Sequence, residues 1–231
     1  MALELHYHPL SSYCWKVLIA LYELGAAFEP VTVDLGDATA RAAYLKLSPF
    51  GKIPALRDAE RAAALYETSI IIDYLDQHHP GRQPLIPADR DQAREAWLGD
   101  RLFDLYVHNV FQRIVADRLR PAGEGDPAAA EQARGELRTA YDVLERHLVG
   151  RTWAAGEAFT LADCAAAPAL FYADLIEPIG NGRRALAAYL GRLRARPSVA
   201  RAISEAKPFF RYYPATPEER GRLAAMGLAE D

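Results

Sequence analysis

Three side chains that can hold or activate a sulfur lie close together near the N-terminus. Ser11, Ser12 and Cys14 follow the apolar strand pattern of residues 3–7 and stand at the start of a predicted helix. The first N–H groups of a helix lack partners within it and its dipole is positive there, so this position favours an anion such as a thiolate. A serine hydroxyl can donate a hydrogen bond to the sulfur and lower its pKa. The simpler interpretation is that one serine only caps the helix.

Two later segments place polar groups at the ends of predicted strands. Residues 50–54, Phe-Gly-Lys-Ile-Pro, put Pro54 at the start of a strand, where its missing N–H is tolerated and a cis bond is frequent. Glu67, Thr68 and Ser69 lie between a strand and a helix. Their hydroxyl and N–H groups can bind a carboxylate, and Glu67 can accept from an ammonium. These groups together predict a site for both ends of an amino-acid moiety.

A fourth motif marks a helix start in the second half of the chain. In Phe159-Thr160-Leu161-Ala162-Asp163, Thr160 can cap the first turn. Asp163, three residues later, can accept from the N–H of the cap. The motif is a capping box with Asp in place of the usual Glu.

The four motifs, in this order and spacing, resemble the cytosolic glutathione transferases over residues 3–206. The chain is similar to the serine-type members, with some resemblance to the zeta and theta classes. The resemblance implies a thioredoxin-like N-terminal domain of mixed α/β structure followed by an all-helical C-terminal domain. It also implies a homodimer, with glutathione as co-substrate bound mainly by the first domain.

The resemblance also assigns roles to individual residues. Ser11 matches the position of the catalytic serine or cysteine. The backbone of Ile53 would bind the cysteinyl part of glutathione next to cis-Pro54. Glu67 and Thr68 would hold the γ-glutamyl group.

Several alternatives to these roles stay open. Ser12 would replace Ser11 if the turn differed by one residue, and Tyr7 lies where tyrosine-type members keep their thiolate-stabilising hydroxyl. Tyr7 also fits a packed strand aromatic. Cys14 could form a mixed disulfide with glutathione, or be a small buried hydrophobe. Lys52 could bind the glycyl carboxylate, or be a solvated surface lysine.

The main functional hypothesis is glutathione transfer. A thiolate stabilised by the helix terminus and Ser11 would attack an electrophilic carbon of a small, mostly apolar substrate. An alternative is a glutathione-dependent isomerase, because Ser-Ser-x-Cys-Trp at residues 11–15 looks like the Ser-Ser-Cys-Ser-Trp of the zeta-type members. Two further alternatives are a thiol transferase acting through Cys14 and a non-catalytic module that binds glutathione or other ligands.

The elements that must position these residues divide the chain in two. Residues 1–80 show strand, helix, strand and helix patterns, a hairpin at 53–56 and 63–66, and a closing helix. The proline-rich segment 81–88 is the predicted linker. Residues 89–231 show helical periodicity at about 89–120, 127–149, 160–176, 183–195 and 197–206, and then an aromatic tail that packs on the body before it frays.

The predicted helix from residue 89 carries side chains that could line a second-substrate site between the domains. They are Phe103, Tyr106, Val107, Val110, Phe111 and Arg113. Such a stripe is equally typical of a core or a dimer interface, so none is assigned to the site.

Composition excludes several other classes of protein. Among the 231 residues, Lys plus Arg is 27 and Asp plus Glu is 31, so the net charge of −4 argues against a nucleic-acid partner. The longest apolar stretch, Cys164–Ala173, is too short for a membrane span, and the N-terminus lacks a secretory signal, which predicts a cytoplasmic protein. His6 and His8 share a strand face but have no third ligand nearby, so we expect no metal.

Overall fold

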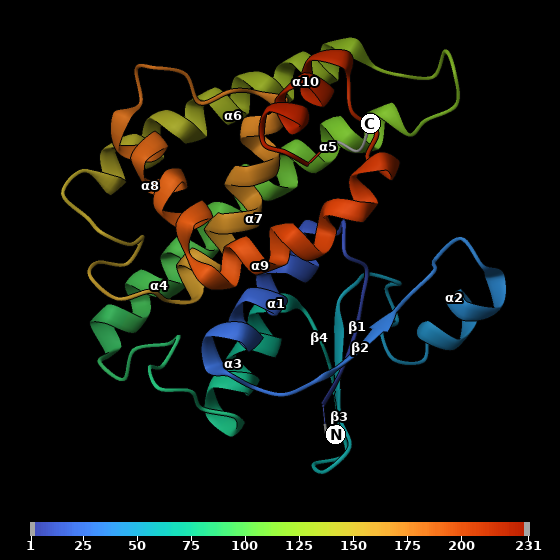
Figure 1. The fold of residues 1–231 in the computed structure, drawn as a ribbon, viewed down its shortest axis with the longest axis vertical. Coiled ribbons are helices and arrows are strands. Elements are labelled where there is room, and N and C mark those ends of the chain that lie inside the picture. Colours follow the sequence, from blue (N-terminus) through green and yellow to red (C-terminus); the bar gives the residue numbers. More distant parts are fainter. Residues whose placement is uncertain (1–2, 229–231) are drawn as a thin grey trace.

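A four-stranded mixed sheet lies beside a larger group of helices (Figure 1). The computed structural model describes residues 3–228. The strand order is β2-β1-β3-β4, in which β1 pairs in parallel with β2 and antiparallel with β3, and β3 pairs antiparallel with β4. The strands are β1 (Leu3–Tyr7), β2 (Glu29–Thr32), β3 (Ala55–Asp58) and β4 (Ala63–Tyr66). The predicted thioredoxin-like arrangement is confirmed.

Helices α1 (Ser12–Leu24) and α3 (Thr68–His78) pack against each other beside the sheet, and α2 (Ala38–Tyr44) lies apart from them (Figure 1). Leu3 and Leu5 of β1 are buried in the main core. Gly25 ends α1 in the left-handed conformation with φ 67°, which a residue without a Cβ adopts at little cost. This stop was predicted from the sequence.

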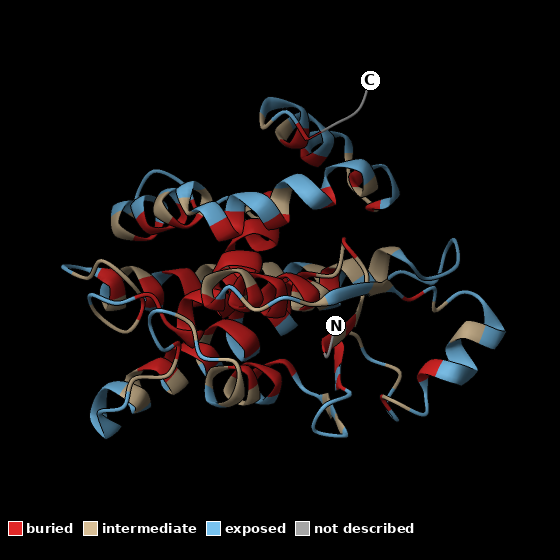
Figure 2. Cartoon of the chain, turned by 60° about the horizontal axis from the view of Figure 1, so that its bottom comes forward, coloured by how far each residue is buried: buried red, intermediate tan, exposed pale blue. Residues whose placement is uncertain are grey.

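Residues 90–228 form helices and contribute no strand to the sheet, as predicted. They include α4 (Arg90–Phe103), α5 (Asn109–Arg118), α6 (Pro127–Leu148), α7 (Leu161–Ile176), α8 (Arg184–Ala195) and α9 (Pro197–Ala206). Helix α7 is buried along almost its whole length. Figure 2 shows that buried residues are concentrated in the middle of the molecule. Helix α4 packs closely on α7. A Cβ at position 99 would lie 2.6 Å from the Cβ of Ala162, which is closer than two such atoms can approach. Gly99 therefore permits this helix crossing.

The predicted capping box at the start of α7 is confirmed. The Ala162 N–H donates to the Thr160 hydroxyl at 3.3 Å, and the Thr160 N–H donates to the Asp163 carboxylate at 2.8 Å. Asp163 also accepts from the Ala154 N–H at 2.9 Å and from the Tyr189 hydroxyl at 2.6 Å. Burial raises its pKa. The motif therefore fixes more than the helix start, because it ties α7 to a loop and to α8.

The predicted helix 89–120 is not continuous. A π-helical turn, η1 (Asp104–His108), separates α4 from α5. A π-turn adds one residue to the helix and rotates every later side chain by about 100° relative to an uninterrupted helix. The helical phase of residues beyond 104 therefore could not be predicted from the pattern before it.

The C-terminal tail is more ordered than predicted. A 3₁₀ turn, η2 (Lys207–Tyr212), is followed by helix α10 (Pro217–Ala225). Thr216 and Glu219 form a second capping box, and buried Glu219 accepts two hydrogen bonds of 2.7 Å from Arg118. The expected fraying is wrong for residues 217–225, while 229–231 lie outside the described residues.

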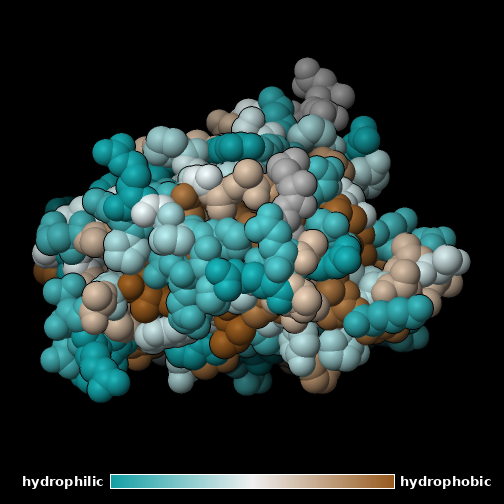
Figure 3. All heavy atoms as spheres, turned by 90° about the horizontal axis from the view of Figure 1, so that it is seen from below, coloured by the Kyte–Doolittle hydropathy of each residue, from teal (hydrophilic) through white to brown (hydrophobic). Residues whose placement is uncertain are grey.

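The segment between α3 and α4, which contains the predicted linker 81–88, has no helix or strand. It packs on both parts of the chain. The Leu85 N–H donates to Asp76 of α3 at 2.7 Å, and the Leu85 carbonyl accepts from the Leu161 N–H of α7 at 2.9 Å. The face shown in Figure 3 has small hydrophobic patches separated by hydrophilic residues. Among residues 3–228, no helix is long and apolar enough to cross a bilayer.

Candidate active site

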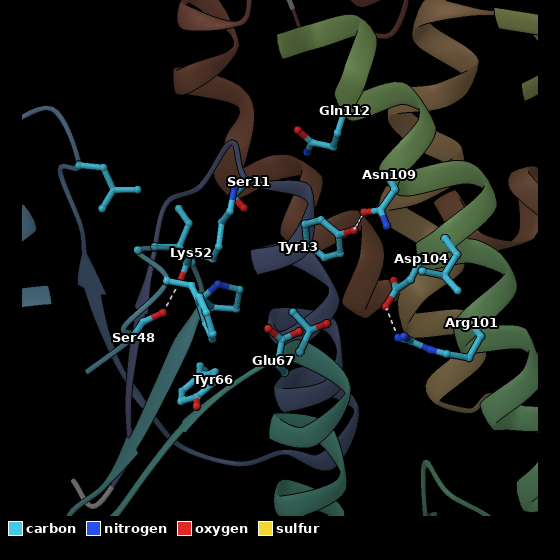
Figure 4. A pocket seen from close by; sticks show the side chains of 17 residues that line it. Ser11, Tyr13, Ser48, Lys52, Tyr66, Glu67, Arg101, Asp104, Asn109 and Gln112 are labelled. Carbon is cyan, nitrogen blue, oxygen red and sulfur yellow. Dashed lines mark hydrogen bonds and ion pairs between the residues drawn. The ribbon is translucent and has the colours of Figure 1, made fainter. Parts of the chain in front are cut away.

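Three chain segments meet at one cavity of about 570 Å³ (Figure 4). They are the turn before α1, the loop before β3 and the junction between β4 and α3. Because β3 runs antiparallel to both β1 and β4, the end of β1, the start of β3 and the end of β4 lie at the same edge of the sheet. The cavity is therefore lined by six of the residues singled out in the sequence: Ser11, Lys52, Ile53, Pro54, Glu67 and Thr68.

Ser11 is the N-cap of α1. Its side-chain oxygen accepts a hydrogen bond from the Cys14 N–H at 3.3 Å, and its own N–H donates to the His8 carbonyl at 2.9 Å. The Ser11 hydroxyl also forms a hydrogen bond with the Cys14 thiol, which opposes the rise of the thiol pKa that burial causes. Ser11 caps the helix and also lines the cavity, so the two interpretations of this serine are compatible.

The loop before β3 is held by its own backbone. The Lys52 carbonyl accepts from the Tyr44 hydroxyl at 2.6 Å and from the Ser48 hydroxyl at 2.9 Å. The next peptide bond, Ile53–Pro54, is cis. Within the described chain, the N–H and carbonyl of Ile53 make no hydrogen bond. These main-chain groups are available to pair with the backbone of a peptide-like ligand.

Glu67 adopts a backbone conformation that is unfavourable for a side chain. Its φ is 71° and its ψ is 114°, and it directly precedes α3. Its exposed carboxylate makes no hydrogen bond or ion pair within residues 3–228, and neither does the Thr68 hydroxyl. Strained, unpartnered polar residues of this kind are concentrated at ligand sites, where the surrounding fold holds them in place.

Comparison with known proteins agrees with this geometry. Residues 5–83 match the family described as glutathione S-transferase, N-terminal domain, and residues 127–213 match glutathione S-transferase, C-terminal domain. The chain belongs to the glutathione S-transferase family. Its relatives include glutathione S-transferase 3 of Zea mays, which is 33% identical over 211 residues, covering 87% of this chain and 93% of the relative.

The similar proteins also include one that is not named as a transferase and one whose structure contains a glutathione derivative. The stringent starvation protein A homolog of Haemophilus influenzae is 28% identical over 200 residues, covering 85% of this chain and 87% of the relative. A solved glutathione S-transferase from Methylobacterium radiotolerans, in complex with glutathione sulfonate, is 30% identical with a TM-score of 0.74. That match covers 87% of this chain and 93% of the other.

The three alternatives to Ser11 do not line the cavity. Ser12 is buried and its hydroxyl points toward α5. Cys14 is fully buried, and burial raises the pKa of its thiol to about 12. Tyr7 lines a separate hollow of about 440 Å³ together with Tyr22. The geometry therefore favours Ser11 over all three, and Cys14 has the surroundings of a core residue.

The first turn of α1 is held by side chains of the helical domain. His108 Nε2 lies 2.6 Å from the Ser12 hydroxyl oxygen, to which Gln112 also donates at 3.1 Å. The neighbouring Tyr13 stacks on His108 and donates its hydroxyl proton to Asn109 at 2.6 Å. The position of the cavity-lining turn therefore depends on residues about a hundred positions later in the chain.

A buried ionic cluster lies beneath the site and was not predicted. Lys16 of α1 is fully buried, and its ammonium lies 2.5 Å from Asp100 and 2.7 Å from Asp104. It also donates to the Ser69 hydroxyl at 3.0 Å, and Arg101 contacts both carboxylates. Burial raises the pKa of Asp104, although Lys16 opposes the shift. The cluster joins α1, α3 and α4 and is balanced in charge.

The wall that α4, η1 and α5 contribute to the cavity is mostly polar. It consists of Arg101, Asp104, Leu105, Asn109 and Gln112. Of the stripe noted in the sequence, Phe103, Val107, Val110 and Phe111 are core residues. Tyr106 and Arg113 lie in adjoining hollows, and Arg113 is paired with Glu136. The sequence offered one indication that this wall lines the cavity, namely the polarity of most of its residues. The same polarity is typical of any solvent-exposed helix face, so it could not identify them.

The histidines outside the helical domain make contacts within the protein. His6 lies 3.6 Å from Glu4, and the ring of His8 accepts from the Leu10 N–H at 3.2 Å. His79, at the end of α3, lies 3.2 Å from the buried carboxylate of Asp58. Within residues 3–228, no group of three or more His, Cys, Asp or Glu side chains is placed to hold a metal ion.

Proposed function

We propose that this chain is a glutathione S-transferase that activates glutathione for attack on a small electrophile. One observation carries the proposal. Ser11 lines the same cavity as the unpaired backbone of Ile53 and the unpartnered side chains of Glu67 and Thr68.

Each end of glutathione has a matching group in the cavity. The Glu67 carboxylate can accept from the γ-glutamyl ammonium, and Thr68, at the first turn of α3, can bind its carboxylate. The backbone of Ile53 can pair with the cysteinyl peptide. The exposed ammonium of Lys52, which lines the same cavity, can bind the glycyl carboxylate. This arrangement directs the thiol toward Ser11.

Ser11 and the start of α1 then stabilise the thiolate. The thiol loses its proton to solvent, and the Ser11 hydroxyl and the free N–H groups of the first turn stabilise the sulfur anion. The sulfur forms a bond to an electrophilic carbon while the leaving group departs with its bonding electrons. Catalysis consists mainly of generating the thiolate and positioning it.

The decisive experiment compares Ser11→Ala with Ser204→Ala, an exposed serine on α9. Both variants should still bind immobilised glutathione. Ser11→Ala should lower kcat with 1-chloro-2,4-dinitrobenzene about a hundredfold and raise the kinetic pKa of the thiol, since one donor to a developing charge contributes about this much. An unchanged rate would overturn the role of Ser11. Glutathione binding without turnover of any electrophile would instead support the non-catalytic module.

We also propose that the protein is a homodimer. Phe50 is 71% exposed and packs edge to face on Tyr66, and both residues line the rim of the cavity. A hollow of about 650 Å³, with mostly apolar lining that includes Leu102, Tyr106 and Val143, lies between α4–α5 and α6. A two-fold pair of chains can bury such surfaces on both partners. Phe50→Ser should shift the mass in analytical ultracentrifugation toward the monomer, whereas Tyr212→Ser, equally aromatic and 64% exposed, should not.

Both cysteines are free and buried, which a reducing compartment allows. We therefore propose a cytoplasmic location.

A further inference from the structure

The exposed side chain of Asn109 presents an amide that is hydrogen-bonded to a tyrosine. Its side-chain oxygen accepts the Tyr13 hydroxyl proton at 2.6 Å (Figure 4). With the amide oxygen engaged in this bond, the NH₂ group lies on the other side of the amide. In the described part of the chain those two N–H donors have no partner, and Asn109 lines the cavity.

The Tyr13 ring that holds Asn109 is itself immobilised. It stacks on the fully buried His108 with ring centroids 3.7 Å apart and an interplanar angle of 2°. On His108 packs Phe111, with centroids 5.1 Å apart. A donor held by a chain of packed rings loses little conformational entropy when it binds a ligand.

Ser11 and Asn109 lie on opposite sides of the Tyr13 side chain (Figure 4). Ser11 is two residues before Tyr13 on the same turn, whereas Asn109 contacts the phenol oxygen, the atom farthest from the backbone. Both residues line the cavity, at different places on its wall.

We propose that the Asn109 amide binds an acceptor oxygen on the second substrate, on a part of that substrate away from the carbon that glutathione attacks. The inference rests on the proposed function and deepens it. The second substrate then carries a nitro, carbonyl or carboxylate oxygen at its far end, and is less apolar than the sequence indicated.

The charge of the wall favours a neutral acceptor. Arg101 is the cation on this wall, and together with Lys16 it is balanced by Asp100 and Asp104. Lys52, the other cation that lines the cavity, is assigned to the glycyl carboxylate of glutathione by the proposed function. A nitro or carbonyl oxygen therefore fits better than a carboxylate, whose burial requires a paired charge.

The test uses benzyl chlorides that share one reacting carbon. Benzyl chloride has no para acceptor, 4-nitrobenzyl chloride has a neutral one and 4-(chloromethyl)benzoate a charged one. In each, the glutathione sulfur bonds to the CH₂ carbon while the C–Cl bond breaks and chloride leaves with the bonding pair. Asn109→Leu should lower kcat/KM about tenfold for the nitro compound and less than twofold for benzyl chloride, since one hydrogen bond is lost.

Two further variants control the result. Asn181→Leu, an exposed asparagine after α7, should change neither rate. Tyr13→Phe keeps the ring but frees the amide, so it should lower kcat/KM selectively for the nitro compound, by less than Asn109→Leu does. Equal losses on benzyl chloride and the nitro compound, or no loss on either, would overturn the proposal. A larger loss on the benzoate than on the nitro compound would show that the acceptor is anionic.

A binding measurement keeps the inference separate from the proposed activity. Calorimetry should show that S-(4-nitrobenzyl)glutathione binds the wild type about tenfold more tightly than S-benzylglutathione, and that Asn109→Leu removes the difference. If the wild type binds both adducts equally, the acceptor site is wrong even where conjugation is fast. If it discriminates between them but turns over no electrophile, the catalytic proposal fails and the acceptor site stands.

Discussion

The imidazole of His108 lies flat on the phenol ring of Tyr13, with centroids 3.7 Å apart, and its Nε2 is 2.6 Å from the Ser12 hydroxyl oxygen. One buried side chain of the helical domain thus contacts both residues that follow Ser11. The first turn of α1, which presents Ser11 to the cavity, is fixed by a contact between the two parts of the chain.

His108 is therefore expected to be a positioning residue for the thiolate. His108→Phe keeps an aromatic ring on Tyr13 but loses the contact to Ser12. It should lower kcat/KM for conjugation about tenfold, since small displacements of a catalytic group are costly. The kinetic pKa of the thiol should rise, which a purely structural role would not cause. Ser12→Ala breaks the same contact, so the losses in the double variant should not add. Fully additive losses would show that the two residues act independently.

Stability should fall in mild acid because His108 is buried in its neutral form. Burial lowers the pKa of His108 well below 6.5, and the positive charge of Lys16 acts in the same direction, while Asp104 lies 3.9 Å from Nδ1. Below pH 6.5 the unfolded chain takes up a proton that the folded chain does not, so the free energy of unfolding decreases as the pH falls. The loss from this residue should reach about 1 kcal/mol between pH 7.5 and 5.5.

Urea titrations at both pH values measure this effect. His108→Phe should remove the part due to His108, and Phe111→Leu, which alters the same ring stack without a titratable group, should keep the wild-type pH dependence. An identical pH dependence in His108→Phe and the wild type would contradict the assignment.

Removing the buried ammonium of Lys16 should destabilise the fold. Lys16→Met leaves Asp100 and Asp104 buried without their main counter-ion, which typically costs about 3–5 kcal/mol. Lys46→Met, at an exposed lysine just after α2, should change the free energy of unfolding by less than about 0.5 kcal/mol. Chemical denaturation measures both variants, and a loss below about 1 kcal/mol in Lys16→Met would mean that Arg101 alone neutralises the pair.

The buried carboxylate of Asp163 should contribute more than an ordinary helix cap. Asp163→Ala leaves the N–H groups of Ala154 and Thr160 and the Tyr189 hydroxyl without their acceptor, a cost of about 2–4 kcal/mol. Asp37→Ala removes an exposed cap that accepts only from the Ala40 N–H, and should cost about 1 kcal/mol. Thermal unfolding of the two variants compares them, and equal losses would show that the network around Asp163 adds nothing.

Cys14 should not take part in the reaction. Because its thiol is fully buried with a pKa raised to about 12, it is protonated and inaccessible at neutral pH. Cys14→Ala should keep its conjugation rate within about twofold of the wild type. Mass spectrometry after exposure to oxidised glutathione should find no adduct on the native protein. An adduct on Cys14 under native conditions would revive the thiol-transferase alternative.

Much of the fold was predictable because its signals are local. Gly25 stops α1 through its own backbone freedom, and Thr160 and Asp163 cap α7 through residues three positions apart. The end of β4 and the start of α3 likewise locate Glu67 and Thr68 at a junction, whatever the rest of the chain does. The tail was mispredicted because its helix depends on the distant Arg118, which pairs with Glu219.

The sequence by itself determined the order of the elements and the short motifs that end at the site, because caps, turns and strand ends depend on neighbouring residues. Only the tertiary structure decided which serine faces the cavity, since Ser12 is drawn away by His108. It also decided that Lys16 meets Asp100 and that the cavity wall beyond the π-turn is polar. Those outcomes depend on how helices from the two parts of the chain approach each other, and no local pattern encodes that approach.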